Sequence, residues 1–482
     1  MTQPNQICRM PISVQPYSHQ KQAWEFALKL LGVLPSNSHS NGVALLMEMG
    51  TGKTITSIGV AGTLYQCGNI NKLLIVAPLS ILGVWYEEFE KFAAFPYTLT
   101  VLEGSCKKKS ETLKQFHGEG LNVVVVNYES TWRLEKELIA WKADMIICDE
   151  GHKLKTHNTS VSKTMHKLGA MAKYKMLLTG TPLTNKAIDI FSQYKFLNPN
   201  IYGQSFYSFR SKYFFMTGYG QHTPVMKESM EEEFTRRMHS IAFRATKAEC
   251  LDLPETTDII RKVALEPPAM KIYKNLVEQS YAELKSGEEV TAPNVLTRLL
   301  RLSQLTGGFL GNDATSAVEE VSKAKLIALE DIIDTSIEEN QKLVIIVRFV
   351  PEIQAIQKTL EKKGIGYSLI MGGVQNREEQ VRQFQTDSSI PIFIGQIATA
   401  GMGLTLTAAS TMVFYSLDYS MSNYEQCRAR IHRAGQKYPC TYIHLLARNT
   451  VDIKVMQALK NKANLAKTLI DDWRNGNNPF DE

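Results

Sequence analysis

Residues 42–66 read GVALLMEMGTGKTITSIGVAGTLYQ, and the rest of the chain is interpreted outward from them. The stretch begins with a continuous apolar run, which is typical of a parallel strand covered by helices on both faces. A glycine-rich turn follows at 49–54, and the residues after it have a helical pattern. A buried strand that leads through such a turn into a helix is typical of a phosphate-binding loop.

The residues of this loop suit a polyphosphate ligand. Gly50 and Gly52 allow the backbone to approach the phosphates, so that successive N–H groups and the start of the following helix face their negative charge. Thr51 lies between these two glycines. We expect Lys53 to reach the β- and γ-phosphates and the Thr54 hydroxyl to bind Mg²⁺. The loop therefore predicts binding of a nucleotide together with Mg²⁺.

A second chemical signal follows another apolar run, MIIC, where Asp149 and Glu150 precede a glycine and His152. A phosphate-loop enzyme requires such an acidic pair. Asp149 can hold Mg²⁺ through its water shell, and Glu150 can accept a proton from the attacking water or orient it. The alternative interpretation is an ordinary acidic strand end at the surface.

The 482 residues contain two groups of strand-like runs, separated by a region of helical pattern. At roughly 100–200 residues per domain, this length predicts two to four domains. The first group is 42–49, 72–78, 122–127, 144–150 and 175–182, and the second is 342–349, 367–372, 391–396, 411–416 and 441–448. We expect an α/β fold with lobe 1 at 1–198, helical insertions and a linker at 199–335, and lobe 2 with a C-terminal helix at 336–482.

The segment QCRARIHRAGQ, 426–436, is predicted to lie on a helix of lobe 2. Gln426, Arg430 and Arg433 are spaced i, i+4 and i+7, so that all three would project from one helix face. Guanidinium groups brought onto a γ-phosphate neutralise the charge that develops as the bond breaks, which is the role of an arginine finger. An exposed basic helix is the alternative interpretation.

Composition and charge bear on the class of protein. No stretch approaches the ~20 uninterrupted apolar residues of a membrane helix, and the N-terminus lacks the pattern of a signal peptide. We therefore expect a soluble, cytoplasmic protein without a membrane partner.

The seven cysteines include no C-x-x-C pair, which disfavours a disulfide scaffold and a zinc knuckle. The net charge of +6 is compatible with a polyanionic partner but does not require one, and we expect the triplet 107–109, KKK, in a solvated loop.

Taken together, these motifs resemble those of the Swi/Snf-type ATPases of helicase superfamily two, over nearly all of residues 14–472. The segment 14–26, VQPYSHQKQAWEF, resembles the opening motif of that family, in which a glutamine, here Gln20, reads the adenine base. The sequence DEGH resembles a DEAH-like box. The segment 75–92 resembles the DNA-contact motif of the first lobe and contains the matching Trp85.

Two further segments extend the resemblance. The segment 177–186, LLTGTPLTNK, resembles the motif that links hydrolysis to movement, with Thr179, Gly180 and Thr181 as the matching residues. In lobe 2, the segment 396–410 matches at its two glycines, Gly401 and Gly403.

Lobe 2 departs from the family pattern at three positions. Ile397 stands where a DNA-contacting threonine is expected, Thr405 where an asparagine is expected, and Tyr419 where a tryptophan is usual. The ATPase residues are intact, and the one mild departure is Met47, which stands where the phosphate-loop pattern commonly begins with a small residue.

The resemblance implies two RecA-like parallel-sheet lobes with helical insertions between them, ATP and Mg²⁺ as ligands, and double-stranded DNA as partner. It implies catalytic roles for Glu150, Arg430 and Arg433. The residues expected to bind ATP are Gln20, Gly50, Thr51, Gly52, Lys53, Thr54, Asp149 and Gln426, of which Thr54 and Asp149 are also the expected metal ligands.

We therefore expect an ATP-dependent translocase or remodelling motor on double-stranded DNA. A strand-separating or branch-remodelling DNA helicase in replication, recombination or repair, acting on forked or branched DNA, is the first alternative. A DNA-binding scaffold with a nucleotide switch is the second. The size resembles short stand-alone bacterial or phage members, which implies the cytoplasm of a bacterial or phage-infected cell and a separate targeting or nuclease partner protein.

Overall fold

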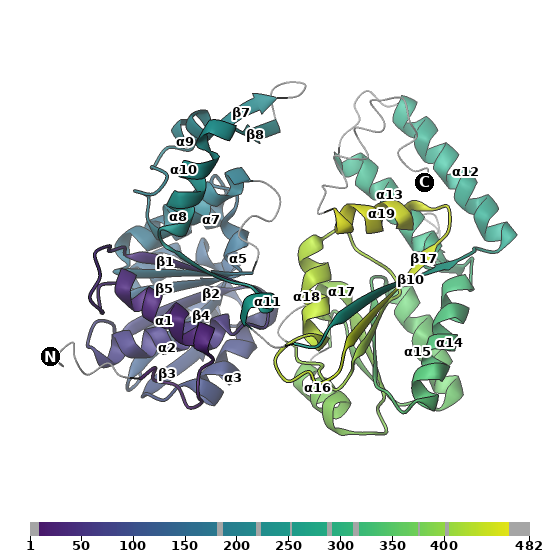
Figure 1. Ribbon diagram of the computed structural model, residues 1–482, viewed down its shortest axis with the longest axis horizontal. Coiled ribbons are helices and arrows are strands. Elements are labelled where there is room, and N and C mark those ends of the chain that lie inside the picture. The colour runs from purple at the N-terminus through teal and green to yellow at the C-terminus, as the bar shows by residue number, and fades with distance from the viewer. Residues whose placement is uncertain are drawn as a thin grey trace. The chain divides into compact units, whose positions relative to one another are not determined.

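The chain forms two compact units, which divide between Asp252 and Leu253. The computed structural model describes residues 9–180, 187–217, 223–250, 253–286, 292–311, 318–374, 376–400 and 404–461. Each unit is built on its own sheet of parallel strands with helices against it (Figure 1). Among the described residues, no helix combines the length and the apolar character needed to cross a bilayer.

The first unit contains a seven-stranded sheet in the order β3-β4-β2-β5-β6-β1-β9. Its strands are β1 (Gly42–Met47), β2 (Lys72–Ala77), β3 (Tyr97–Val101), β4 (Leu121–Asn127), β5 (Met145–Asp149), β6 (Tyr174–Thr179) and β9 (Ala242–Ala245). All neighbouring strands pair in parallel, so their carboxyl ends lie at one edge of the sheet. The five apolar runs predicted for lobe 1 are confirmed as β1, β2, β4, β5 and β6.

Helices cover both faces of this sheet, with α1, α2 and α3 on one side and α5, α7 and α8 on the other (Figure 1). The helices are α1 (Ser18–Leu30), α2 (Lys53–Gln66), α3 (Leu82–Phe92), α4 (Cys106–Gln115), α5 (Tyr128–Thr131), α6 (Glu135–Trp141), α7 (Ser160–Met171), α8 (Ile190–Leu197), α9 (Phe206–Tyr213), α10 (Glu228–His239) and α11 (Lys247–Cys250), with short 3₁₀ helices η2 (Leu79–Ile81), η3 (Gly151–Leu154) and η4 (Ala187–Asp189). Burial on both faces explains why the central strands are continuous apolar runs.

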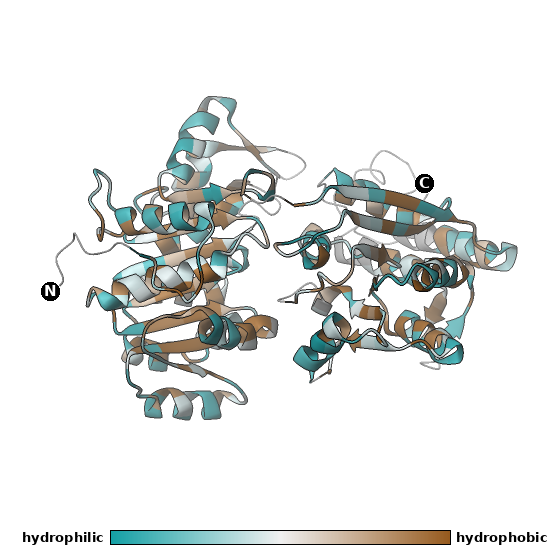
Figure 2. Ribbon diagram, turned by 60° about the horizontal axis from the view of Figure 1, so that its bottom comes forward, coloured by the Kyte–Doolittle hydropathy of each residue, from teal (hydrophilic) through white to brown (hydrophobic). Residues whose placement is uncertain are grey.

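The second unit contains a six-stranded sheet in the order β10-β17-β16-β13-β15-β14, again with parallel neighbours. Its strands are β10 (Thr256–Val263), β13 (Leu343–Val347), β14 (Tyr367–Ile370), β15 (Ile392–Gln396), β16 (Thr411–Phe414) and β17 (Cys440–Ala447). Its helices are α12 (Pro267–Ser286), α13 (Ala292–Thr306), α14 (Ala324–Glu338), α15 (Val350–Lys363), α16 (Arg377–Thr386), α17 (Ile397–Ala400), α18 (Met421–Ile431) and α19 (Val451–Lys460). The five runs predicted for lobe 2 are confirmed, and the strands of both sheets carry mostly hydrophobic residues (Figure 2).

Besides the two small strand pairs β7–β8 and β11–β12, three strands of the large sheets were not predicted from the sequence. Strand β3 is half-buried along its length, β9 has only four residues, and most residues of β10 are exposed. All three lie at sheet edges, where one side of the strand has no neighbour and a continuous apolar run is not needed.

The region 199–335, expected as helical insertions and a linker, is shared between the two units. Its first part contains α9, α10 and the hairpin of β7 (Phe214–Thr217) and β8 (Thr223–Met226), before β9 joins the first sheet beside β1. Its second part begins with β10, which joins the second sheet beside β17, and includes the small pair β11 (Phe309–Gly311) and β12 (Val318–Glu320). The region belongs to both sheets because each receives an edge strand from it.

The expected solvated loop at 107–109 is wrong, because these lysines lie on α4 and Lys109 is buried. The Lys109 amine donates to Asn127 Oδ1 at 2.9 Å and to Ser130 Oγ at 2.8 Å. Burial lowers its pKa. These hydrogen bonds satisfy the buried amine and fix the turn between β4 and α5.

Two buried polar contacts tie the second unit together. The amine of Lys325 lies 2.6 Å from Asp452 Oδ2, which joins α14 to α19. Glu352, near the start of α15, accepts hydrogen bonds on Oε2 from Ser416 Oγ at 2.6 Å and from the N–H of Phe349 at 3.1 Å. Within the described part of the chain, Glu352 Oε1 has no hydrogen-bond partner.

Replacing Glu352 by glutamine should make the free energy of unfolding fall less steeply as the pH rises. Burial raises the pKa of Glu352 from about 4.5 to about 7. Because the folded state then holds this proton more tightly than the unfolded chain, its stabilising effect is full below about pH 4.5 and is lost as the pH rises through about 7. Thermal unfolding should therefore show the Glu352→Gln protein gaining stability over the wild type between about pH 5 and about pH 8. Glu338→Gln, at an exposed position, is the control, and parallel pH profiles for wild type and Glu352→Gln would contradict the assignment.

Candidate ATPase site

The predicted phosphate loop connects β1 to α2 in the first unit. Gly50 and Gly52 have φ values of 85° and 88°, a left-handed conformation that glycine adopts without a steric cost. A Cβ atom at Gly52 would lie 2.1 Å from Gln20 Nε2, so no other residue fits at this position without displacing that side chain. Helix α2 begins directly afterwards at Lys53. Its first N–H groups have no partner within the helix and carry the positive end of the helix dipole.

Lys53 folds over this loop. Its amine donates to the carbonyl oxygens of Met47 at 2.8 Å and Glu48 at 3.3 Å, and the Thr51 hydroxyl donates to the Glu48 carbonyl at 2.7 Å. Thr54 is the second residue of α2 and therefore lies at the same helix end. The loop residues proposed to bind ATP thus lie together at the carboxyl end of β1.

The first turn of α1 holds the loop from the other side. Gln20 is buried, and its Nε2 donates to the Thr51 carbonyl at 3.3 Å while its Oε1 accepts from the N–H of Tyr17 at 3.0 Å. His19 Nε2 lies 2.7 Å from the same carbonyl oxygen of Thr51. Sequence analysis did not identify His19, because only the fold shows that its ring reaches the loop.

Asp149 ends β5, at the same sheet edge as the loop. Its carboxylate accepts from the N–H of Glu150 at 2.9 Å and from Trp85 Nε1 at 3.2 Å, and its backbone carbonyl accepts from Tyr128 OH at 2.7 Å. Burial raises the pKa of Asp149 to about 7, and the charge of Glu150 adds to this effect while Lys53 opposes it. The sequence matched Trp85 to a motif without revealing this contact, and it did not indicate Tyr128.

Glu150 has a φ of 48°, which is uncommon for a residue other than glycine. Such a conformation costs roughly 1–2 kcal/mol and persists where neighbours determine it. Here the next residue is Gly151, where a Cβ would lie 2.2 Å from Leu177 Cγ. Glu150 Oε2 lies 3.2 Å from His152 Nδ1 on η3. The backbone therefore fixes the direction of Glu150, and His152 lies beside its carboxylate.

These groups have the chemistry that a magnesium nucleotide requires. A carboxylate from Asp149 and a hydroxyl from Thr54 are oxygen ligands of the kind that Mg²⁺ prefers. Among the described residues, no group of three or more His, Cys, Asp or Glu side chains could hold a metal ion by itself.

In the second unit, α18 carries Gln426 and Arg430 but ends at Ile431. The predicted single helix face is therefore wrong for Arg433, which follows the helix end. Beyond the helix end, the Gln436 side chain donates to the carbonyl oxygens of Ile431 at 3.1 Å and Ala409 at 2.8 Å, which holds the chain in a turn.

The two arginines nevertheless come together. Nη1 of Arg430 and Nη1 of Arg433 each donate to the carbonyl oxygen of Leu404 at 3.1 Å. Arg430 Nε also donates to the carbonyl of Gln426 at 2.9 Å, and Gln426 Nε2 donates to Ser422 Oγ at 3.2 Å. One backbone carbonyl, rather than helix spacing, therefore aligns the two guanidinium groups.

The strand that begins the second unit is bound to α18. Arg428 forms a bidentate ion pair with Asp258 on β10, donates to Tyr424 OH at 2.8 Å, and has its guanidinium carbon 3.9 Å from the centre of the Tyr442 ring. His432 Nε2, just after the helix, lies 2.9 Å from the carbonyl of Pro254. Sequence analysis did not identify Asp258 or Arg428, because their pairing spans 170 residues.

Of the departures from the family pattern, Ile397 is buried, whereas Thr405 and Tyr419 are half-buried. Ile397 lies in the core of the second unit. The Tyr419 hydroxyl lies 3.1 Å from Ser303 Oγ, and the Arg348 guanidinium lies 4.1 Å from the centre of its ring. Thr179 is buried at the end of β6.

Three of the matching residues, Thr181, Gly401 and Gly403, lie outside the described residues. Gly180 is described, and a Cβ there would lie 3.4 Å from the Met47 carbonyl oxygen beside the loop.

Comparison with known families agrees with this arrangement. The model of the SNF2-related domain matches residues 19–306, and that of the helicase conserved C-terminal domain matches residues 324–435. Because the first match covers more than half of the chain, the protein belongs to the SNF2-related family.

The individual relatives have low sequence identity to this chain. An uncharacterised ATP-dependent helicase of Mycoplasma pneumoniae is 27% identical over 442 residues, which are 89% of this chain and 40% of that protein. The DNA repair and recombination protein RAD54-like of Gallus gallus is 26% identical over 484 residues, which are 90% of this chain and 64% of that protein. The chain thus spans less than two thirds of the length of these relatives. A solved structure, the Sulfolobus solfataricus SWI2/SNF2 ATPase core in complex with dsDNA, is 25% identical with a TM-score of 0.47 and covers 96% of this chain and 95% of that one.

Replacing Asp258 by asparagine should loosen α18. The Arg428 side chain is only 17% exposed, so Asp258→Asn leaves a largely buried charge without its carboxylate partner. We expect amide hydrogen exchange in α18 to become about tenfold faster, which corresponds to about 1.4 kcal/mol. Mass spectrometry of the exchanged peptides measures this effect.

The matched control for this substitution is Asp331→Asn. Asp331 pairs with Arg261, which also lies on β10, but this pair is exposed and does not involve α18. Exchange in α18 should remain at the wild-type rate in the control. Equal rates in Asp258→Asn and wild type would show that the ion pair does not hold the helix.

Proposed function

We propose that this protein is an ATP-dependent motor that tracks along double-stranded DNA. The observation that carries the proposal is the convergence, at one edge of one parallel sheet, of Lys53 on the phosphate loop with Asp149 and Glu150 at the end of β5, in a chain of the SNF2-related family. Strands β1 and β5 are separated in the sheet only by β6. The two motifs are therefore close enough to act on one bound nucleotide.

The proposed roles follow from the contacts of each residue. The N–H groups at the start of α2 and the Lys53 amine bind the phosphates, and Gln20 supports the loop and the adenine side of the site. Glu150 orients the attacking water or accepts its proton, with His152 beside its carboxylate. Mg²⁺, held by Thr54 and Asp149, would neutralise part of the phosphate charge.

The second unit supplies the remaining groups in this proposal. Arg430 and Arg433 stabilise the negative charge on the γ-phosphate as the bond breaks, and Gln426 belongs to the same set. The shared contact with the Leu404 carbonyl supports this role, because it aligns both guanidinium groups before they act. The contacts of Arg428 and His432 with residues 254–258 connect these arginines to the beginning of the second unit.

Movement along DNA requires that hydrolysis changes how the two units hold the backbone. If each unit binds backbone phosphates alternately, a cycle of ATP binding and product release becomes a step. Backbone contacts carry little sequence information, so the motor should have weak sequence preference and a steep dependence of affinity on salt. The net charge of +6 is compatible with this partner.

The alternative is a helicase that separates strands or remodels branched DNA. The relatives named as DNA repair and recombination proteins favour a substrate of this kind over RNA. The same ATPase groups serve both activities, so the DNA structure that stimulates hydrolysis distinguishes them. A third possibility, a DNA-binding scaffold with a nucleotide switch, requires no turnover.

Steady-state ATP hydrolysis should be stimulated by plain duplex DNA more than by single-stranded DNA, a fork or RNA. Lys53→Ala and Glu150→Gln should each lower the stimulated kcat by about a hundredfold or more, because each removes a group that acts on the reacting phosphate or water. Glu150→Gln should still bind ATP, since it keeps the loop and Lys53. Lys21→Ala, which alters an exposed lysine of α1, is the control and should have wild-type activity.

The same assay separates the alternatives. A clear preference for the fork would support the strand-separating or branch-remodelling helicase. A Glu150→Gln protein that is inactive in hydrolysis but retains the biological task would support the switch. Hydrolysis that no nucleic acid stimulates would contradict the motor.

A further inference from the structure

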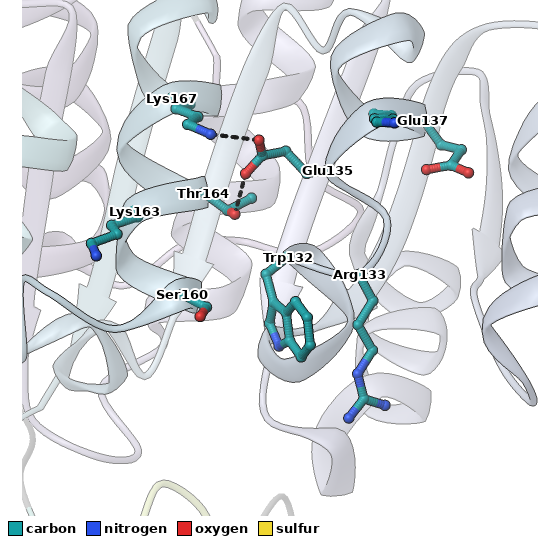
Figure 3. A pocket seen from close by; sticks show the side chains of 9 residues that line it. Trp132, Arg133, Glu135, Glu137, Ser160, Lys163, Thr164 and Lys167 are labelled. Carbon is teal, nitrogen blue, oxygen red and sulfur yellow. Dashed lines mark hydrogen bonds and ion pairs between the residues drawn. The ribbon is translucent and has the colours of Figure 1, made fainter.

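A cavity of about 530 Å³ lies on the first unit, away from the proposed ATPase residues. Its walls come from Trp132 and Arg133, which follow α5, from α6, and from the first two turns of α7 (Figure 3). No residue of the phosphate loop or of the DEGH sequence lines it. Strand β4, which leads into α5, is separated from β5 by β2, so the cavity lies off a different part of the sheet edge.

One wall of the cavity is an aromatic ring. The Trp132 side chain is exposed, which is uncommon for so large an apolar group. The Arg133 guanidinium lies 5.2 Å from the centre of the indole ring, and Figure 3 shows the ring between Arg133 and Ser160 of α7. An exposed indole that lines a cavity offers a flat surface on which another planar group can stack.

The other walls carry a net positive charge, because they contain four basic side chains (Arg133, Lys136, Lys163 and Lys167) and two carboxylates (Glu135 and Glu137). Glu135 is already neutralised, because its carboxylate lies 2.6 Å from the Lys167 amine and accepts from the Thr164 hydroxyl at 2.5 Å (Figure 3). In the described part of the chain, no carboxylate lies within ion-pair distance of Arg133, Lys136 or Lys163. The cavity therefore combines a net positive charge with one aromatic surface, which together suit an aromatic group that carries a negative charge.

The start of α7 adds a second element of anion recognition. Ser160 and Lys163 lie in its first turn, and α7 has twelve residues, enough for a positive dipole end. Thr159 already caps this helix through the N–H of Ser162, so the helix end supports the anion mainly by charge. The Ser160 hydroxyl and the Lys163 amine are the direct donors available to a phosphate.

We propose that this cavity binds one nucleotide of an unpaired DNA strand, with the base stacked on Trp132 and its phosphate held by Arg133, Ser160 and Lys163. A base inside a duplex is covered on both faces by its neighbours, whereas an unpaired nucleotide in a gap or overhang can turn a base face to the indole. The site is separate from the ATPase residues, and its binding requires neither ATP nor movement. Its test is therefore independent of the proposed motor function.

The test measures binding without ATP by fluorescence anisotropy, with a labelled blunt duplex and with the same duplex carrying a single-stranded overhang. The wild type should bind the overhang substrate more tightly. Trp132→Ala should weaken binding of that substrate about tenfold and leave blunt duplex unchanged, and Trp132→Phe should recover most of the loss because it keeps a stacking surface. Lys163→Gln should lower the slope of log affinity against log salt by roughly 0.7 on the overhang substrate.

Tyr207→Ala is the matched control. Tyr207 is 70% exposed and has the Arg210 guanidinium 5.3 Å from its ring centre, but it does not line the cavity. This variant should bind both substrates as the wild type does. Duplex-stimulated ATP hydrolysis by Trp132→Ala should also be unchanged, which shows that the variant is folded.

Several results would overturn the proposal. Equal affinity of the wild type for both substrates would show that no unpaired nucleotide is recognised. An equal loss of affinity for both substrates in Trp132→Ala would show that the cavity binds duplex DNA. Displacement of the overhang by AMP at similar concentration would assign the cavity to free nucleotides, and displacement by polyglutamate as efficient as by an oligonucleotide would assign it to an acidic peptide.

Discussion

The buried carboxylate of Asp149 is the interaction on which the first unit depends. Removing a carboxylate from water is costly unless donors and a cation compensate for it. Here the N–H of Glu150 and the indole N–H of Trp85 donate to it, and the nearby charge of Lys53 lowers its pKa against the effect of burial. The Trp85 hydrogen bond links α3 to the end of β5, and the Glu150 hydrogen bond lies at the turn that follows this strand, at the same sheet edge as the phosphate loop.

In the second unit, shared contacts hold the side chains of Arg430 and Arg433 in fixed positions. Arginine side chains lose considerable rotamer entropy when they are held in one position. Arg430 and Arg433 share the Leu404 carbonyl, and Arg428 is held between Asp258 and the Tyr442 ring. These contacts position the guanidinium groups in advance and connect them to β10, the strand with which the unit begins. A change at either end of this connection can therefore affect the other.

Sequence patterns predicted the fold well where burial is complete. The ten predicted apolar runs are the nine interior strands of the two large sheets and the edge strand β14, because strands buried on both faces favour a continuous apolar composition. The edge strands β3, β9 and β10 were missed for the opposite reason. The loop at 50–54 and the acidic pair 149–150 could be predicted as parts of a site because each motif consists of residues that are adjacent in the sequence. The hydrogen bond of Trp85, the burial of Lys109, the pairing of Arg428 with Asp258 and the end of α18 before Arg433 depend on residues far apart in the chain, and no local pattern encodes them.

The central claim is that ATP hydrolysis moves this protein along double-stranded DNA, and displacement of a third strand from a triplex tests it most directly. A labelled third strand is placed at increasing distances from the entry site on a duplex, and its release is followed after ATP is added. The account predicts release only with hydrolysable ATP, after a delay that lengthens in proportion to distance, while the duplex strands remain paired. Release without a distance-dependent delay, or separation of the duplex strands in its place, would contradict it.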